Sequence, residues 1–405
     1  MNIVIAGFGV AGATAAETAR QLAPKAYITI FSQEKDLFYY RPRLPEVISG
    51  DLSPDKVIAH PQSWYDERGL ELRLGEKLLE VDLAARQVRG STGSRQTFDR
   101  LLLAVGAEAN RPNLPGDKLE NVFAIRSLNN AWSLALAAKG RKKAVIIGGG
   151  LLGLETGAAL AKQGLEITVL EQGERVLPRQ TTPRGAALLR RKLGAAGLGF
   201  ELQAQVARLE GAGRVENVVL KDGRSFEADL VIISAGVNSN LTLAAALGLT
   251  VERAIVVDEY LETSAPGLYA AGDCVQFPGA AGGLWTTARA QGLTAGANLA
   301  AATTADRRKY RPVPPANTLK VAKVDLTAAG NLDPEGRLFG IEAETDEAYR
   351  KVVVDAAGRL TGFTNIGGVQ GNRELAQALA DQAVLSPQAL SGLAGLDFDF
   401  ARLRS

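Results

Sequence analysis

The chain has 405 residues, of which 46% are hydrophobic and 22% charged, and this predicts two or three domains with a sizeable core. Lys and Arg number 46 against 44 Asp and Glu, and the net charge of +2 is too small to make nucleic acid or an anionic membrane the main partner. One Cys and one His exclude an intrachain disulfide, and also any Cys/His metal or iron–sulfur site built by this chain alone.

The first expected elements are a strand and a helix joined by glycines, in NIVIAGFGVAGATAAETARQL at 2–22. Its Gly7-x-Gly9-x-x-Gly12 pattern is typical of a turn that lets a pyrophosphate approach the backbone at a helix N-terminus. The sequence opens on this strand rather than on a charged leader, and no apolar run reaches the ~18–20 residues of a membrane span. A cytoplasmic location without a membrane partner is therefore expected.

The next strand, YITIFSQEK at 27–35, carries Ser32 where a ribose-binding acid is expected. Glu34, two residues later, is our ribose candidate; a solvated carboxylate at the strand end is the alternative. The segment FYYRPRLPE at 38–46 follows directly. Its two prolines argue against an ordinary helix or central strand there, so it is either a rigid surface turn or part of a binding site.

A second glycine pattern lies in KAVIIGGGLLGLETGAALAKQGLEITVLEQ at 143–172. Gly148-x-Gly150-x-x-Gly153 again separates an apolar strand from a helix, and two such patterns in one chain predict two dinucleotide sites. Glu171 ends the next strand, 18 residues after Gly153, where a carboxylate would bind ribose hydroxyls and repel a 2′-phosphate. NADH is therefore favoured over NADPH, although Arg175 lies four residues further on.

Three further segments complete a known order of motifs. FDRLLLAVGAEANRP at 98–112 and FEADLVIISAGVNSN at 226–240 each combine a strand with a glycine, and TSAPGLYAAGDCVQF at 263–277 contains Gly272-Asp273. Together with the glycine patterns they resemble the FAD-dependent pyridine nucleotide oxidoreductases with two dinucleotide domains. In that superfamily the aspartate of the last motif binds the flavin ribityl chain.

The resemblance implies an α/β fold with two Rossmann-like dinucleotide-binding domains, as in glutathione reductase, and a small α/β C-terminal domain. The FAD-binding domain would comprise 1–112 and 241–310, with the NAD-binding domain inserted at 113–240. A proline-rich linker, YRPVPPAN at 310–317, marks the boundary with the C-terminal domain at 311–405. The order of strands and a late helix in this last part shows no further dinucleotide pattern.

Several segments are similar to one branch of the superfamily. FYYRPRLPE resembles the Y-x-R-P-x-L segment of nitrite reductase flavin domains and of ferredoxin and rubredoxin reductases, and GGLWTTARAQG resembles their Ala-x-x-Gln-Gly helix. NADH:rubredoxin oxidoreductase is the most similar type. Disulfide reductases place redox cysteines where this chain has FYYRPRLPE. We expect Cys274 near the flavin ribityl or phosphates, either as a buried filler residue or, as the lesser alternative, as a redox thiol.

The resemblance assigns two sets of binding residues. Around FAD, together with Glu34, they are Gly7, Gly9, Gly12, Arg41, Pro42, Ala104, Gly106, Gly272, Asp273, Trp285, Thr286, Ala288 and Gln291. Around NADH they are Gly148, Gly150, Gly153 and Glu171. Arg41 would counter phosphate charge, and Trp285 would border the isoalloxazine unless it is only a core aromatic.

Two carboxylates are candidates at the hydride-transfer site. Glu155 matches a position whose carboxylate meets the nicotinamide amide in similar reductases; the alternative is a first-turn Glu stabilised by the helix dipole. Glu46 stands where oxygenase ferredoxin reductases carry a Lys near the flavin. A negative charge there would disfavour the anionic reduced flavin, whereas an Arg43–Glu46 ion pair would merely fix the turn.

The expected function is hydride transfer from NADH to FAD, followed by electron transfer to a small carrier protein, rubredoxin first and a ferredoxin-like protein second, without a redox disulfide. Direct reduction of oxygen or a quinone is the alternative, to which the Gly-rich PGAAGGLW at 278–285 could give access. An NADH-sensing switch similar to apoptosis-inducing factor is a minor one. The chain would act as a monomer or homodimer.

Overall fold

The computed structural model describes residues 1–278, 282–312, 316–321, 324–333 and 336–403, and it divides into two compact units. Unit 1 comprises Met1–Leu44, Leu52–Glu108 and Val237–Val313, and unit 2 comprises Pro45–Asp51, Ala109–Gly236 and Pro314–Ser405. Part of the glycine-rich segment at 278–285, residues 279–281, lies outside the described residues.

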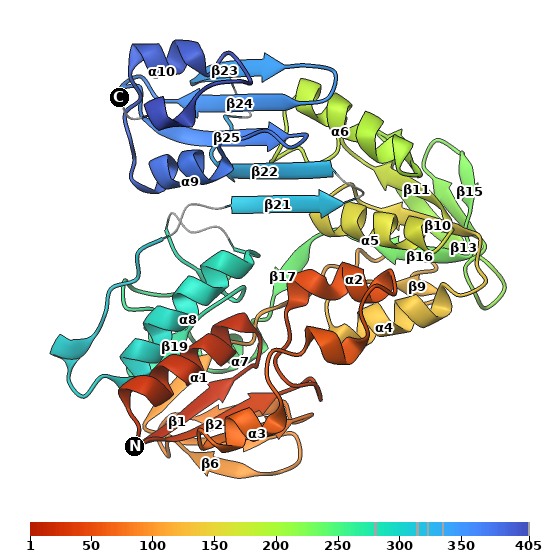
Figure 1. Ribbon diagram of the computed structural model, residues 1–405. Helices are drawn as coiled ribbons and strands as arrows, with labels where there is room; N and C mark the ends of the chain where they lie inside the picture. Colours follow the sequence, from red (N-terminus) through yellow and green to blue (C-terminus); the bar gives the residue numbers. More distant parts are fainter. Residues whose placement is uncertain (279–281, 313–315, 322–323, 334–335, 404–405) are drawn as a thin grey trace. The chain divides into compact units, whose positions relative to one another are not determined.

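Unit 1 is built on a parallel sheet of five strands in the order β19-β7-β1-β2-β3. Figure 1 labels β1, β2 and β19 of this sheet. Their bounds are β1 Asn2–Ala6, β2 Tyr27–Ser32, β3 Leu70–Leu74, β7 Arg100–Leu103 and β19 Leu268–Ala270. These strands are largely buried and rich in Ile and Leu, which is the usual composition of a parallel sheet covered on both faces. The order places segments from both ends of unit 1 in one sheet.

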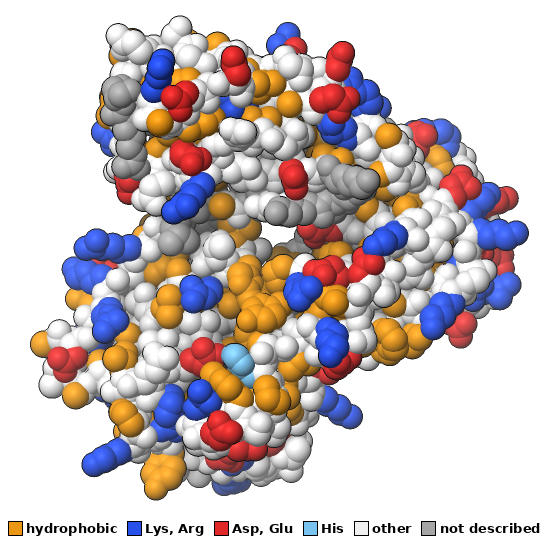
Figure 2. All heavy atoms as spheres, in the orientation of Figure 1, with side chains coloured by type: hydrophobic (Ala, Val, Ile, Leu, Met, Phe, Trp, Pro, Cys, Tyr) orange, Lys and Arg blue, Asp and Glu red, His pale blue; other side chains and the backbone are white. Residues whose placement is uncertain are grey.

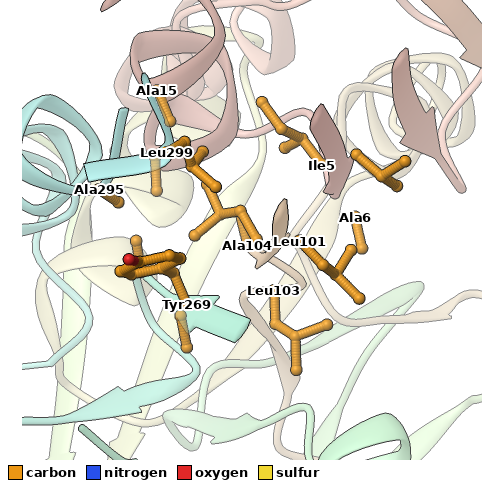
Figure 3. Close-up of a cluster of buried hydrophobic side chains, with 14 of the residues drawn as sticks. Ile5, Ala6, Ala15, Leu101, Leu103, Ala104, Tyr269, Ala295 and Leu299 are labelled. Atoms are coloured by element: carbon orange, nitrogen blue, oxygen red, sulfur yellow. The ribbon is translucent and has the colours of Figure 1, made fainter. Parts of the chain in front are cut away.

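Two long helices of unit 1, α1 (Val10–Leu22) and α8 (Trp285–Ala300), pack closely against each other. Gly292 and Gly296 allow this approach, since a Cβ at either would lie 2.6 or 2.5 Å from a carbonyl oxygen of α1. Figure 3 shows part of this core, where Ala15 of α1 and Ala295 and Leu299 of α8 lie on one side of side chains from β1, β7 and β19.

Shorter elements complete unit 1. They are α3 Gln62–Asp66, β4 Leu78–Asp82, β5 Gln87–Gly90, β6 Arg95–Thr97, β8 Ala107–Ala109, β17 Val237–Ser239, α7 Thr242–Ala246, β18 Ile255–Val256 and β20 Val275–Gln276, with 3-10 turns at Arg41–Arg43, Pro54–Val57 and Thr304–Asp306. Strands β4, β5 and β6 form an antiparallel sheet, and β8 pairs with β17.

Unit 2 contains a second parallel sheet in the order β12-β11-β10-β16-β9. Its strands are β9 Val122–Phe123, β10 Lys143–Ile147, β11 Glu166–Glu171, β12 Leu198–Leu202 and β16 Leu230–Ile233, with the helices α2 Leu44–Ile48, α4 Leu128–Ala137, α5 Leu151–Lys162 and α6 Pro183–Ala195. A three-stranded sheet of β13 Val206–Glu210, β14 Asn217–Leu220 and β15 Ser225–Glu227 adjoins it. Two Rossmann-like parallel sheets in an α/β chain confirm the expected fold class.

The C-terminal part of unit 2 is an antiparallel sheet in the order β21-β22-β25-β24-β23. Its elements are β21 Ala316–Val321, β22 Val324–Gly330, β23 Phe339–Glu344, β24 Tyr349–Val354, β25 Leu360–Ile366, α9 Asn372–Ala380, α10 Pro387–Gly392 and a 3-10 turn at Phe400–Arg402. Helix α6 packs on this sheet, where the Thr182 and Tyr349 hydroxyls lie 2.6 Å apart.

On the face shown in Figure 2, basic and acidic side chains are interspersed with hydrophobic ones. Among the described residues, no helix is both long and apolar enough to cross a membrane. Within the same residues, no three His, Cys, Asp or Glu side chains cluster as metal ligands would.

Candidate functional site

The first glycine pattern forms a tight turn between β1 and α1. Gly7 has φ +109°, and a Cβ on it would lie 2.1 Å from the carbonyl oxygen of Ala104, so only glycine fits. A Cβ at Gly12 would lie 2.0 Å from the carbonyl oxygen of Gly7. Gly9 caps α1 and has open space beside it, since a Cβ there would meet no atom within 4 Å. The N-terminus of α1 is therefore open beside Gly9, as is expected of a helix end that accepts a phosphate.

The second pattern in unit 2 repeats this geometry. Gly148 has φ +112°, and its Cβ would lie 2.3 Å from the carbonyl oxygen of Ser234; a Cβ at Gly153 would lie 2.4 Å from that of Gly148. Gly150 caps α5 and is open on its outer side. Each unit thus contains one turn with the features of a dinucleotide phosphate site.

Glu171, at the end of β11, binds the loop of the second pattern. One carboxylate oxygen accepts the N–H of Gly149 and the other accepts the N–H of Gly173, both at 2.7 Å. A carboxylate that accepts backbone hydrogen bonds is fixed in orientation and keeps lone pairs for further donors. The assignment of this group to ribose hydroxyls stays a prediction. Arg175 donates to the Pro178 carbonyl oxygen at 3.3 Å.

Glu34 lies beside Arg41, although the two were predicted for different parts of the cofactor. The guanidinium and carboxylate are 3.0 Å apart, and the Tyr39 hydroxyl donates to the same carboxylate at 2.7 Å. Burial by itself lowers the pKa of Arg41, but the negative groups around it, Asp273 among them, raise that pKa overall. Arg41 therefore carries a firm positive charge close to the Gly-Asp turn of the FAD motifs.

The turn at Gly272 and Asp273 follows β19, in the sheet that carries Gly7. Gly272 has φ +87° and Asp273 is partly exposed. Cys274 is fully buried, and its Sγ donates to the carbonyl oxygens of Leu103 and Ala271. Burial raises the pKa of the Cys274 thiol to about 11, so it stays protonated and a poor nucleophile.

Ala104 and Gly106 follow β7 at the same edge of the sheet. The N–H of Ala104 donates to the Ala6 carbonyl oxygen at 2.8 Å, and the carbonyl oxygen of Gly106 accepts from the N–H of Asn240 at 2.9 Å. Gly106 has φ +64°, which glycine tolerates best. These contacts tie the first crossover segment to β1 and to the chain after β17.

Trp285 is the first residue of α8, and its ring stacks on that of Phe38, in the segment after β2. Its ring lies 5.9 Å from that of Phe38 with 16° between the planes, and 6.0 Å from that of Tyr40. Thr286 is exposed, as is Pro42 in its 3-10 turn, whereas Ala288 and Gln291 are buried. The carbonyl oxygen of the Gln291 side chain accepts the N–H of Gly272 at 2.7 Å.

Glu155 lies in the second turn of α5, since the helix begins at Leu151 and has no acidic residue in its first turn. The alternative of a first-turn Glu stabilised by the helix dipole is therefore wrong. Burial raises the pKa of Glu155 to about 7, against an ordinary value of 4.5. Glu46 is in the first turn of α2, and the segment that carries it belongs to unit 2. Both candidate carboxyl groups thus belong to the unit with the second glycine pattern.

The structure adds three residues that the sequence did not suggest: Tyr39, which binds Glu34; Gly149, which binds Glu171; and Ser239, whose Oγ donates to the Asp273 carbonyl oxygen at 2.7 Å. A hydroxyl or a glycine in such a position carries no distinctive pattern. Only Gly149, inside a glycine pattern already recognised, could have been inferred from its neighbours.

Comparisons with known proteins point to one family. The model of the pyridine nucleotide-disulphide oxidoreductases matches residues 1–292. The rubredoxin-NAD(+) reductase of Pseudomonas putida is 34% identical over 276 residues, covering 68% of this chain and 72% of that protein. The assimilatory nitrate reductase electron transfer subunit of Bacillus subtilis is 30% identical over 389 residues, or 95% of this chain, which spans only 50% of that longer relative.

Among solved structures, the ferredoxin reductase for the CYP199A2 system of Rhodopseudomonas palustris superposes with a TM-score of 0.90 at 26% identity, covering 100% of both chains. These matches confirm the resemblance to flavoprotein reductases.

Proposed function

Because the chain belongs to the pyridine nucleotide-disulphide oxidoreductase family, we propose that it passes electrons from NADH through FAD to a small carrier protein, rubredoxin. It is a flavoprotein oxidoreductase that uses FAD and NADH. When bound, FAD accepts a hydride and releases the two electrons; the protein supplies alignment, charge and exclusion of water. The proposal concerns the carrier and the route by which electrons leave.

The observation that carries this proposal is that the single cysteine, Cys274, is buried and has a raised pKa. A thiol relay needs a thiolate that can reach the flavin and usually a second cysteine, whereas Cys274 is fully buried with a pKa raised to about 11. The segment at 38–46, where disulfide reductases place their redox cysteines, has aromatic, basic and proline residues instead. Electrons would therefore leave this flavin directly.

We assign the FAD domain to 1–112 and 241–310, the NAD domain to 113–240, and the C-terminal domain to 311–405. Within the FAD domain, the first glycine pattern would bind the pyrophosphate, Arg41 would balance its charge, and Asp273 would accept hydrogen bonds from the ribityl hydroxyls. Trp285 would border the isoalloxazine.

Within the NAD domain, the second glycine pattern would bind the NADH pyrophosphate and Glu171 the adenosine ribose. Glu155 would accept from the nicotinamide amide when ionised, and its pKa of about 7 means that it exchanges a proton near neutral pH. Glu46, which lies in the range 1–112 assigned to the FAD domain, would set the charge near the flavin, and so its reduction potential.

Rubredoxin is our choice of carrier because a rubredoxin-NAD(+) reductase is similar over most of this chain. A ferredoxin-like carrier is the second candidate, supported by the fold shared with a ferredoxin reductase. Electrons in both carriers move one at a time, so neither requires a general acid or a nucleophile from this chain.

The test is to reduce the purified flavoprotein with NADH under anaerobic conditions, then add rubredoxin, a ferredoxin, a quinone or air, and follow the return of flavin absorbance. We expect rubredoxin to reoxidise the flavin fastest. Faster reoxidation by oxygen or by a quinone would refute the carrier proposal. A reduced protein that none of these acceptors reoxidises would instead support an NADH-sensing switch.

A further inference from the structure

The turn formed by Gly272 and Asp273 lies between the two long helices of unit 1. A Cβ on Gly272 would lie 3.1 Å from the Cβ of Ala11, in the first turn of α1, and 3.9 Å from that of Ala288 in α8. Three motifs of the FAD domain therefore meet at one backbone position: the first glycine pattern, the Gly-Asp turn and the Ala-x-x-Gln-Gly helix. The hydrogen bonds that hold this turn therefore determine the orientation of the Asp273 carboxylate.

Gln291 provides one of the bonds that fix the turn. Strand β19 ends at Ala270, so the Gly272 N–H lies beyond the strand, and the Gln291 Oε1 accepts it at 2.7 Å. Gln291 is 2% exposed, so water cannot easily replace it. A buried N–H without a partner is costly, and the loss of this acceptor would favour a rearranged turn.

Ser239, which precedes the turn in the sequence, forms a second hydrogen bond to it. It ends β17, and its Oγ donates to the backbone carbonyl oxygen of Asp273 at 2.7 Å. The peptide groups on the two sides of the Asp273 turn are thus held by two side chains, one from α8 and one from a crossover strand.

We propose that Gln291 and Ser239 are positioning residues that hold Asp273 in the orientation needed to bind the flavin ribityl chain. This inference rests on the proposed function, in which Asp273 is an FAD ligand. Neither residue needs to touch the cofactor: Gln291 would act through the Gly272 N–H, and Ser239 through the Asp273 carbonyl oxygen.

The first test compares Gln291→Met with Asn298→Leu, since Asn298 is a buried amide of the same helix. Asn298 is fully buried and bonds the backbone of Tyr260 and Arg308, away from the turn. In each holoenzyme, hydrogen–deuterium exchange of the peptide covering 268–277 and the rate of FAD release are measured, together with the melting temperature.

We expect Gln291→Met to increase exchange at the turn and to release FAD roughly tenfold faster, as the loss of a buried hydrogen bond implies. Asn298→Leu should lower the melting temperature but leave both readouts of the turn within about twofold. Gln291→Glu keeps the acceptor and should restore low exchange. Equal exchange at 268–277 in the Met and Leu variants would overturn the inference, and so would unchanged exchange in Gln291→Met.

Ser239 offers an independent arm if a Gln291 variant fails to fold. Ser239→Ala removes the donor and should increase exchange at the turn, whereas Ser239→Thr keeps a hydroxyl and should not; identical exchange in the two would count against the role of Ser239. Asp273→Asn separates the two levels of the proposal. If it releases FAD at the unsubstituted rate, the assignment of Asp273 as an FAD ligand fails, even where Gln291→Met still loosens the turn.

Discussion

The buried carboxyl group of Glu155 leads to a quantitative prediction. Its pKa rises from 4.5 to about 7 because burial penalises the ionised form. The difference of about 2.5 units corresponds to about 3 kcal/mol at 1.36 kcal/mol per unit. Since the pKa is higher in the folded protein, there is no penalty below about pH 4.5; stability is lost as pH rises, and the full cost is reached above about pH 8.

Glu155→Gln keeps the shape and removes the ionisation. Compared with the unsubstituted holoenzyme, we expect little difference in melting temperature near pH 4.5 and a gain of several degrees for the Gln variant near pH 9, where it avoids a cost of about 3 kcal/mol. The matched control is Glu166→Gln, which changes an exposed carboxylate at the start of β11 in the same domain. Infrared difference spectra of the protonated carboxyl band give the titration midpoint directly.

Two outcomes would refute this reasoning. One is a gain in melting temperature for Glu155→Gln that is the same at acid and alkaline pH, which would indicate a packing effect rather than ionisation. The other is a carboxyl band that is already lost at pH 5.5. The second outcome would mean that water or a positive group reaches Glu155 and offsets its burial.

Three other predictions follow from the geometry. Gly9→Ala should fold normally but weaken FAD binding at least tenfold, because its Cβ would project into the open space at α1. Gly7→Ala should fail to fold, because its Cβ would lie 2.1 Å from the Ala104 carbonyl oxygen. A folded Gly7→Ala protein, or undiminished FAD binding by Gly9→Ala, would contradict this. Cys274→Ala should keep the rate of NADH-dependent carrier reduction within about twofold, and a loss of turnover in the folded variant would reveal a redox thiol. Glu171→Arg should shift the ratio of kcat/KM toward NADPH by at least tenfold, and an unchanged ratio in steady-state assays would count against Glu171 as the ribose ligand.

The parts of the fold that the sequence predicted are those in which backbone geometry restricts residue type. Gly7 and Gly148 must be glycine because carbonyl oxygens lie within 2.3 Å of a Cβ, and a restriction of this kind leaves a pattern that can be read. Buried parallel strands leave an equally clear pattern of Ile, Val and Leu. Both signals are local, and both led to the correct fold class.

Side-chain partners could not be predicted in the same way. Glu34 is predicted to bind a ribose, and the structure adds that its carboxylate also binds Tyr39 and Arg41, which the sequence did not indicate. Gln291 is predicted to lie beside the flavin, and the structure adds that its Oε1 accepts the Gly272 N–H. Contacts of this kind form between side chains and backbone groups that folding brings together, and a single segment of sequence does not show which groups will meet.

The first part of the segment FYYRPRLPE belongs to unit 1 and its last two residues belong to unit 2. Arg41 binds Glu34 in unit 1, whereas Pro45–Asp51 belong to unit 2. There, Gln163 at the end of α5 donates to the Ile48 carbonyl oxygen, and Lys162 pairs with Asp51. Helix α5 therefore carries Glu155 and is also bonded to the segment that carries Glu46. Both acids therefore belong to the same compact unit, and a double-mutant cycle on the melting temperature would measure whether they are coupled.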